Sequence, residues 1–196
     1  MLKTHISEIA SSSTKKLMSS SIVIKKKIRE FIDNRFVAGD KSLSIRWVLL
    51  SSISTGKSIA INLLKSEDVL ASIDTIKKLG IKVKFVGEKC IIYGKGINGY
   101  SVKKNLILDA KNSGTLGRLI LGLLIDTKNS IKLIGDRSLS KRDFKRVTKP
   151  LEKFGASFKL KNGKYLPITI QGSKKLKPIK FYENKGSAQC KSSIIF

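Results

Sequence analysis

Cysteine and histidine are scarce in this sequence of 196 residues, which has two of the first and one of the second. Cys90 and Cys190 lie far apart without metal-ligand spacing, which argues against a disulfide framework or a zinc site. A reducing compartment such as the cytoplasm is therefore expected. The single histidine, His5, lies near the N-terminus, so histidine-based catalysis has little support in this chain.

Long apolar runs are also absent. Even the run 119–125 is bounded by Arg118 and Asp126, and it is far shorter than the roughly 20 residues that span a membrane. Hydrophobic residues make up 41% of the chain, which is enough for the packed core of about one domain. We therefore expect a soluble globular protein without a membrane partner.

Acidic residues are few, 14 against 40 lysines and arginines, so the formal net charge is +26. Such an excess favours anionic partners, and nucleic acid is the usual first candidate. The basic residues are spread along the whole chain, however, and aromatic residues make up only 7%. A lysine-rich bias on solvated surfaces explains the excess equally well, so charge alone does not assign a function.

The string Gly39-Asp40-Lys41-Ser42-Leu43-Ser44-Ile45-Arg46, followed by an apolar run, predicts a loop that leads into a helix. Asp40 or Ser42 can cap the helix, and Ser42 and Arg46 share one face of it. Helix N-termini attract anions, and Lys41 and Arg46 add positive charge there. This stretch is therefore a candidate anion site.

The same arrangement recurs at 112–118 and at 186–191, where small polar residues again open apolar runs. Arg46 and Arg118 lie 72 residues apart. A period of that length is longer than in solenoid repeats, so it favours a compact α/β domain of repeated units. The alternative is that any α/β chain alternates in this way.

The hydrophobic patterns predict β-α-β-α-β-β units. Residues 1–21 are rich in serine, threonine and lysine and are expected to be a disordered leader, with a targeting peptide as the less favoured alternative. Strands are expected over 21–24, 31–37, 57–62, 81–86, 89–93, 106–109 and 130–134, with hairpins across 87–88 and 162–163. Helices are expected over 43–52, 67–79, 114–125 and up to about 154.

Two glycines, Gly114 and Gly117, stand in the first turn of the expected helix 114–125. Each costs roughly 1 kcal/mol of helix stability relative to alanine. Close approach of the backbone to another group is one explanation, and helix packing is the other.

Four strings together resemble the 5-enolpyruvylshikimate-3-phosphate synthase family: 39–46, Asn112-Ser113-Gly114-Thr115, Gly135-Asp136 with Arg142, and Ser187-Ala188-Gln189 with Lys191. The resemblance implies an α/β enolpyruvyl transferase fold of two domains, each with three repeated units. Residues 39–196 would then be the first domain, with two complete units and the start of a third. Residues 22–38 would be strands near the inter-domain hinge.

This resemblance implies a transferase that joins phosphoenolpyruvate to shikimate 3-phosphate without a metal or organic cofactor. Lys41 would contact both substrates, and Ser42 and Arg46 would bind shikimate 3-phosphate. Asn112, Gly114 and Arg142 would serve phosphoenolpyruvate. The remaining substrate-binding residues would be Ser187, Ala188 and Gln189, of which Gln189 reaches both ligands.

Two residues depart from the family pattern: Ile45 replaces a histidine or asparagine, and Asp143 replaces a proline. Asp143 adds a negative charge beside Arg142 and is expected to weaken anion binding. The family's acid/base carboxylates have no counterpart here, so no catalytic residue is assigned and the isolated chain is expected to be inactive. Phe196 ends an apolar helix whose burial would need further residues, so we expect the chain to be a fragment. The full-length enzyme is expected to be a monomer.

Two alternatives stay open. An enzyme like UDP-N-acetylglucosamine enolpyruvyl transferase shares the fold and phosphoenolpyruvate, but it lacks the Asp-Lys-Ser-x-Ser-x-Arg string of residues 40–46. A basic nucleic-acid-binding module is the alternative without enzymatic activity.

Overall fold

The structure is a computed structural model, and it describes residues 23, 37–184 and 186–196. Residues 37–196 form one compact unit. The leader expected over 1–21 lies outside the described residues, as do the strands expected over 21–24 and 31–37, apart from Val23 and Val37.

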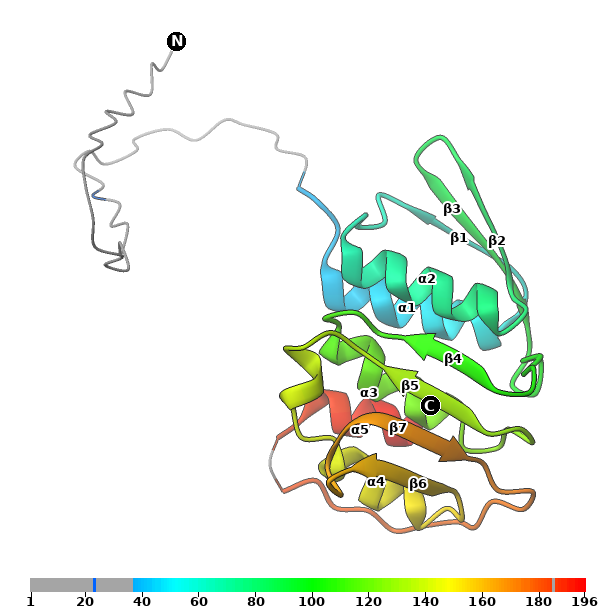
Figure 1. The fold of residues 1–196 in the computed structure, drawn as a ribbon. Coiled ribbons are helices and arrows are strands. Elements are labelled where there is room, and N and C mark those ends of the chain that lie inside the picture. The colour runs from blue at the N-terminus through cyan, green and yellow to red at the C-terminus, as the bar shows by residue number, and fades with distance from the viewer. Residues whose placement is uncertain (1–22, 24–36, 185) are drawn as a thin grey trace. The chain divides into compact units, whose positions relative to one another are not determined.

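The first part of the unit pairs two helices with a small sheet (Figure 1). Helix α1 (Lys41–Ile53) and helix α2 (Glu67–Lys78) lie side by side against the antiparallel sheet β1-β3-β2. Its strands are β1 (Thr55–Ile61), β2 (Lys82–Val86) and β3 (Lys89–Lys95). The hairpin expected across Gly87 and Glu88 is confirmed.

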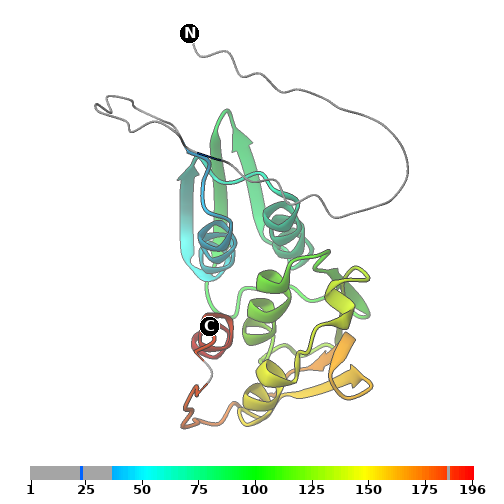
Figure 2. The ribbon, with the colours of Figure 1, turned by 90° about the vertical axis from the view of Figure 1, so that its left-hand side faces the viewer.

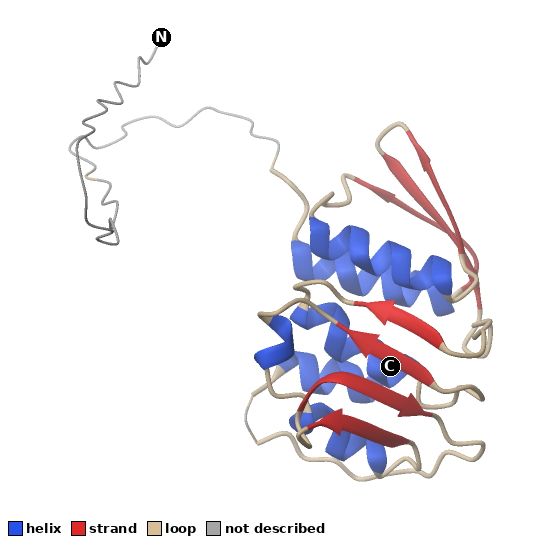
Figure 3. Cartoon of the chain, in the orientation of Figure 1, coloured by secondary structure: helices blue, strands red, loops and turns tan. Residues whose placement is uncertain are grey.

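The second part is built around a four-stranded sheet of order β4-β5-β7-β6. Strands β4 (Leu106–Asp109) and β5 (Ile131–Ile134) are parallel, because helix α3 (Gly114–Leu123) makes the crossover between them. Strands β6 (Ser157–Lys161) and β7 (Tyr165–Gln171) form the second expected hairpin. In Figure 3 the helices α3, α4 (Lys145–Glu152) and α5 (Ala188–Ile195) lie behind this sheet. A short 3-10 helix, η1 (Leu139–Lys141), precedes α4.

Helix α3 is the centre of the core. All ten of its residues are buried, including the polar Thr115 and the charged Arg118. Helix α5 packs directly against it, as Figure 2 shows from the side. A Cβ atom on Gly122 would overlap the carbonyl oxygen of Ser193, so glycine is required for this close backbone contact.

The mixed α/β fold is confirmed, and every strand and helix expected within the described residues is present. The second expected unit is present in full, with the order β4-α3-β5-α4-β6-β7. The first unit has the order α1-β1-α2-β2-β3, and its expected first strand is not among the strands of the described residues. The number of units, and the division into domains, stay predictions. Among the described residues, no helix is long and apolar enough to cross a membrane.

Candidate functional site

A cavity of about 490 Å³ opens where four helices begin. The first residues of α1, α2 and α3 and the second residue of α5 all reach it. Free N–H groups and the positive end of the helix dipole stabilise anions at such termini. The lining residues are Lys41, Ser42, Glu67, Asp68, Asn112, Gly114, Thr115, Arg142 and Gln189.

The start of α1 is fixed by Asp40, whose side chain accepts a hydrogen bond of 2.7 Å from the backbone N–H of Leu43. This cap places Lys41 and Ser42 in the first turn, at the mouth of the cavity. Lys41 Nζ forms an ion pair of 3.0 Å with Asp68 Oδ2 at the start of α2. The lysine side chain remains 53% exposed, so it is open to a ligand.

At the start of α3, Ser113 caps the helix by accepting a hydrogen bond of 3.2 Å from the N–H of Leu116. A Cβ atom on Gly114 would lie 2.9 Å from Nη1 of both Arg118 and Arg142. Gly114 therefore brings bare backbone up to two guanidinium groups. Nη2 of Arg142 also donates to Asn112 Oδ1 at 3.4 Å, which joins two of the predicted residues.

Gly117, one turn further along α3, faces the protein interior. Its missing Cβ would meet the Phe144 ring at 3.4 Å and Ala110 at 3.5 Å. Of the two explanations for the helix glycines, packing therefore accounts for Gly117, and close approach to charged groups accounts for Gly114.

The start of α5 is capped by Ser187, which accepts from the N–H of Cys190 at 3.2 Å. Gln189 then projects toward α3 and lines the cavity. Ser187 and Ala188 begin the same helix but do not line the cavity.

Arg46 also lies outside the cavity lining. Its guanidinium group bridges α1 and α5, donating to Ser192 Oγ at 3.4 Å and 3.3 Å. It also donates to the carbonyl oxygen of Ser42 at 3.2 Å, which confirms that Ser42 and Arg46 share a helix face. Six of the nine predicted substrate-binding residues thus line one cavity, and the other three lie on its two flanking helices, α1 and α5.

Sequence reasoning noted the spacing of Arg118 but gave it no place in the site. The structure buries this side chain directly behind the cavity, at 7% exposure and 5.2 Å from the centre of the Phe144 ring. Burial lowers the pKa of Arg118, and the nearby charges of Arg146 and Arg142 lower it further, against an opposing effect of Asp143. An arginine nevertheless stays charged at physiological pH, so a buried cation is hydrogen bonded to Gly114 and Gln189, two residues of the cavity lining.

Three further lining residues were missed: Glu67, Asp68 and Thr115. Glu67 and Asp68 are acidic residues in the first turn of α2, a position that the helix dipole favours without any ligand. Thr115 follows Gly114 in one of the strings that resemble the family, and this position in the sequence could have marked it as a site residue.

The two departures from the family pattern occupy positions away from the cavity lining. Ile45 is fully buried in the core. The Asp143 carboxylate accepts a hydrogen bond of 2.6 Å from the N–H of Lys145, the first residue of α4. The expected weakening of anion binding by Asp143 stays a prediction.

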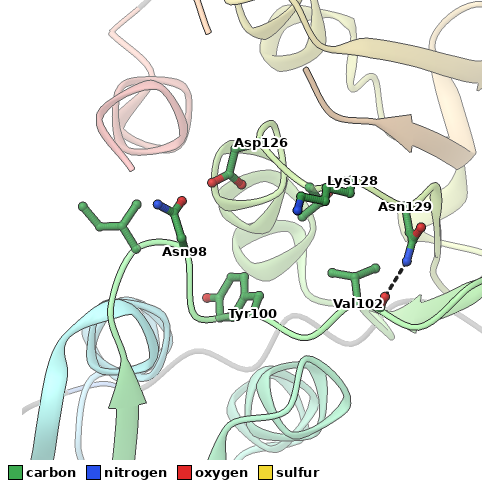
Figure 4. Close-up of a pocket in the computed structure, with 8 residues that line it drawn as sticks. Asn98, Tyr100, Val102, Asp126, Lys128 and Asn129 are labelled. Carbon is green, nitrogen blue, oxygen red and sulfur yellow. Dashed lines mark hydrogen bonds between the residues drawn. The ribbon is translucent and has the colours of Figure 1, made fainter. Parts of the chain in front are cut away.

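A second cavity of about 490 Å³ lies near the other end of α3 (Figure 4). Burial raises the pKa of Asp126 in its wall, and burial raises the pKa of Tyr100 to about 12. The Tyr100 hydroxyl is hydrogen bonded to Ser52 Oγ at 2.6 Å, and Asn129 donates to the Val102 carbonyl at 2.7 Å. A helix C-terminus and a carboxylate disfavour anions, so this cavity is a poor candidate for an anionic substrate.

Within the described part of the chain, no group of three or more histidine, cysteine or acidic residues is placed to hold a metal ion. The lysine, the arginine, the side-chain amides and the helix N-termini that line the first cavity can recognise anions.

Comparisons with known proteins agree on one family. The model of EPSP synthase (3-phosphoshikimate 1-carboxyvinyltransferase) matches residues 34–196. The 3-phosphoshikimate 1-carboxyvinyltransferase of Streptococcus agalactiae is 41% identical over 182 residues, which cover 92% of this chain and 41% of that protein. The enzyme of that name from Caldicellulosiruptor bescii is 42% identical over 169 residues, 86% of this chain and 39% of the relative.

A solved structure of EPSP synthase from Acinetobacter baumannii is also similar, with a TM-score of 0.75 and 34% sequence identity. The match covers 81% of this chain and 36% of that one. The chain thus spans about two fifths of the length of the curated relatives that it matches.

Proposed function

The chain belongs to the EPSP synthase family, and on that basis we propose that it binds the substrates of 3-phosphoshikimate 1-carboxyvinyl transfer. This reaction moves the enolpyruvyl group of phosphoenolpyruvate to shikimate 3-phosphate and releases phosphate, in the pathway to aromatic amino acids. The observation that carries the proposal is the convergence of six substrate-binding residues, predicted from four separate strings, on one cavity at helix N-termini.

In the proposed complex each ligand meets a different wall. Shikimate 3-phosphate binds Ser42 and Arg46 on α1 and Ser187 and Ala188 at the start of α5. Phosphoenolpyruvate lies beside Asn112 and Gly114, with Arg142 as its guanidinium partner. Lys41 and Gln189 reach both ligands. Supporting this division, Arg142 and Asn112 are hydrogen bonded to each other, while Arg46 bridges α1 to α5.

The ion pair of Lys41 with Asp68 supports a role for Lys41 in ligand binding. The Lys41 ammonium group has three N–H donors, so it can keep its ion pair with Asp68, which is only 18% exposed, and still donate to a phosphate group in the cavity. The chain is proposed to bind and orient both anions, and no catalytic acid or base is assigned to it.

The proposal includes a cytoplasmic location and a monomeric enzyme. The free, buried thiols of Cys90 and Cys190 support a reducing compartment. The similar proteins named above are all EPSP synthases, which favours this function over the first alternative, an enzyme like UDP-N-acetylglucosamine enolpyruvyl transferase. A nucleic-acid-binding module has only the net charge of +26 in its favour.

Calorimetric titration tests the proposal in the chain of 196 residues. Shikimate 3-phosphate is expected to bind more tightly than shikimate, because the helix N-termini and Arg46 recognise the phosphate. Phosphoenolpyruvate is expected to bind more tightly once shikimate 3-phosphate is present. Equal affinity for shikimate and its 3-phosphate would contradict the proposal, and so would tight, steeply salt-dependent binding of duplex DNA with no response to shikimate 3-phosphate.

A further inference from the structure

The side-chain amide of Gln189 is held at both ends. Its Oε1 accepts a hydrogen bond of 2.8 Å from Arg118 Nη1, and its Nε2 donates one of 3.1 Å to Thr115 Oγ1. We propose that Arg118 and Thr115 are positioning residues that orient the Gln189 amide as a hydrogen-bond donor to the bound anion. This inference rests on the proposed function, in which Gln189 contacts both substrates.

The chemistry of the partners fixes which end of the amide faces which residue. A guanidinium group can only donate, so the oxygen of Gln189 must face Arg118. The NH₂ group then faces Thr115, whose hydroxyl oxygen can accept. An amide has two N–H donors, and Thr115 takes only one of them, so one N–H is left for a ligand in the cavity that Gln189 lines. With the amide reversed, Gln189 would present an oxygen, which repels a phosphate or carboxylate.

Arg118 itself is held rigidly enough to act as the fixed point. Besides the bond to Gln189, it donates to the carbonyl oxygens of Gly114 and Asp143, each at 3.4 Å. Its guanidinium group also lies over the Phe144 ring. A buried, rotamer-restricted arginine of this kind transmits its orientation to whatever it bonds.

Fold stability alone does not account for an arginine at position 118. Its Nε is buried without a hydrogen-bond partner, and it forms no salt bridge with a carboxylate among the described residues. Burying such a charge is unfavourable, and an apolar side chain of similar length would pack against Phe144 without that cost. The hydrogen bond to Gln189 is what an apolar residue could not supply.

The backbone of α5 is anchored separately from this amide. Ser193 Oγ donates to the carbonyl oxygen of Arg118 at 2.9 Å, and Cys190 is buried in the core. Gly122 contacts the Ser193 backbone directly. Changes at the side chain of Thr115 should therefore leave α5 in place and alter only the amide.

Nuclear magnetic resonance of the ¹⁵N-labelled chain tests the clamp without a ligand. The Gln189→Glu variant lacks the side-chain NH₂ group, so the pair of NH₂ signals missing from its spectrum belongs to Gln189. In the unsubstituted chain, the Gln189 amide proton that is hydrogen bonded to Thr115 Oγ1 should exchange with water more slowly than the other proton of the same NH₂ group. Thr115→Val should abolish this difference, Thr115→Ser should restore most of it, and Thr148→Val, a buried threonine in α4, serves as the matched control. Equal exchange of both protons in the unsubstituted chain would overturn the inference.

Titration with phosphoenolpyruvate in the presence of shikimate 3-phosphate tests the consequence for binding. Thr115→Val should weaken affinity about 2- to 10-fold, the effect of losing one neutral hydrogen bond, and Thr115→Ser should recover most of that loss. In a Gln189→Ala background the same Thr115→Val change should have no further effect. An equal loss in both backgrounds would overturn the positioning role. Failure of the unsubstituted chain to bind either substrate would overturn the proposed function, whereas the exchange rates decide independently whether the clamp exists.

Discussion

Replacing Gly114 by alanine tests whether bare backbone forms the phosphoenolpyruvate wall of the cavity. The added Cβ would lie 2.9 Å from Nη1 of Arg118 and 2.9 Å from Nη1 of Arg142. Because ordinary contact begins at about 3.5 Å, both guanidinium tips lie roughly half an ångström too close to the new methyl group, and both contacts have to be relieved.

The contacts of the two arginines decide which one moves farther. Arg118 is buried and donates to three acceptors, one of them Gln189 at 2.8 Å. Arg142 is exposed, and its guanidinium group is bonded to Asn112 at 3.4 Å. Arg142 should therefore be displaced, and it is the residue proposed to bind phosphoenolpyruvate.

The size of the effect follows from the bonds that Arg142 would lose. A hydrogen bond to a charged group contributes roughly 1.5–3 kcal/mol, so affinity for phosphoenolpyruvate should fall on the order of 10- to 150-fold. Affinity for shikimate 3-phosphate should barely change, because its proposed ligands lie on α1 and α5. Overlap with the buried Arg118 costs on the order of 1–3 kcal/mol, and the better helix propensity of alanine offsets about 1 kcal/mol of that, so the free energy of unfolding should fall by no more than about 2 kcal/mol.

Calorimetric titration of each ligand into Gly114→Ala and the unsubstituted chain measures this difference. Gly117→Ala is the matched control on the same helix, since its new methyl group would meet only the Phe144 ring and Ala110 at ordinary distances. An equal loss of affinity for both ligands, or an unchanged affinity for phosphoenolpyruvate, would refute the reasoning.

Three further predictions concern other parts of the unit. Arg46→Ala should weaken binding of shikimate 3-phosphate on the order of 10- to 150-fold in titrations, while Arg46→Lys keeps the charge, loses the planar fork and recovers only part of the affinity. An equal effect on unphosphorylated shikimate would show that Arg46 does not recognise the phosphate. Gly122→Ala should lower the free energy of unfolding by about 1–3 kcal/mol in denaturant titrations, since α5 must shift away from α3, and an unchanged value would contradict the close packing of the two helices. Burial raises the pKa of Asp126, so its protonated form is favoured in the folded state and its contribution to stability is lost as pH rises above the ordinary carboxylate pKa of about 3.8. Asp126→Asn should therefore raise the melting temperature at pH 7 relative to the unsubstituted chain, with the advantage disappearing toward pH 3, and a constant difference across that range would count against it.

Local signals in the sequence predicted the helix starts well. Asp40 was one of two possible caps of α1, and the structure selects it through the bond to Leu43. The i,i+4 spacing of Ser42 and Arg46 likewise placed the two residues on one face, as their hydrogen bond shows. Such features depend on neighbours within one or two turns, so the sequence alone contains them.

The different roles of the two repeated arginines could not be predicted in this way. Arg46 and Arg118 occupy similar positions in the repeat, yet Arg46 is half-buried and bonded to Ser192, whereas Arg118 is buried against Phe144. Burial depends on which elements pack over each arginine, and those elements lie far along the chain. Gly122 is similar, because only the approach of Ser193 reveals why it must be glycine.

Hydrogen bonds between residues that are remote in sequence join α5 to α1 and α3, two other helices that reach the cavity. Arg46 and Ser192 are separated by 146 positions, and Arg118 and Gln189 by 71. Contacts of such long range carry the largest loop-closure entropy and are slow to form. Each single helix can appear early, but the anion site is complete only after α5 has docked on α1 and α3, because α5 supplies Gln189. Acquisition of shikimate 3-phosphate binding during refolding would therefore time the last long-range step of folding in this unit.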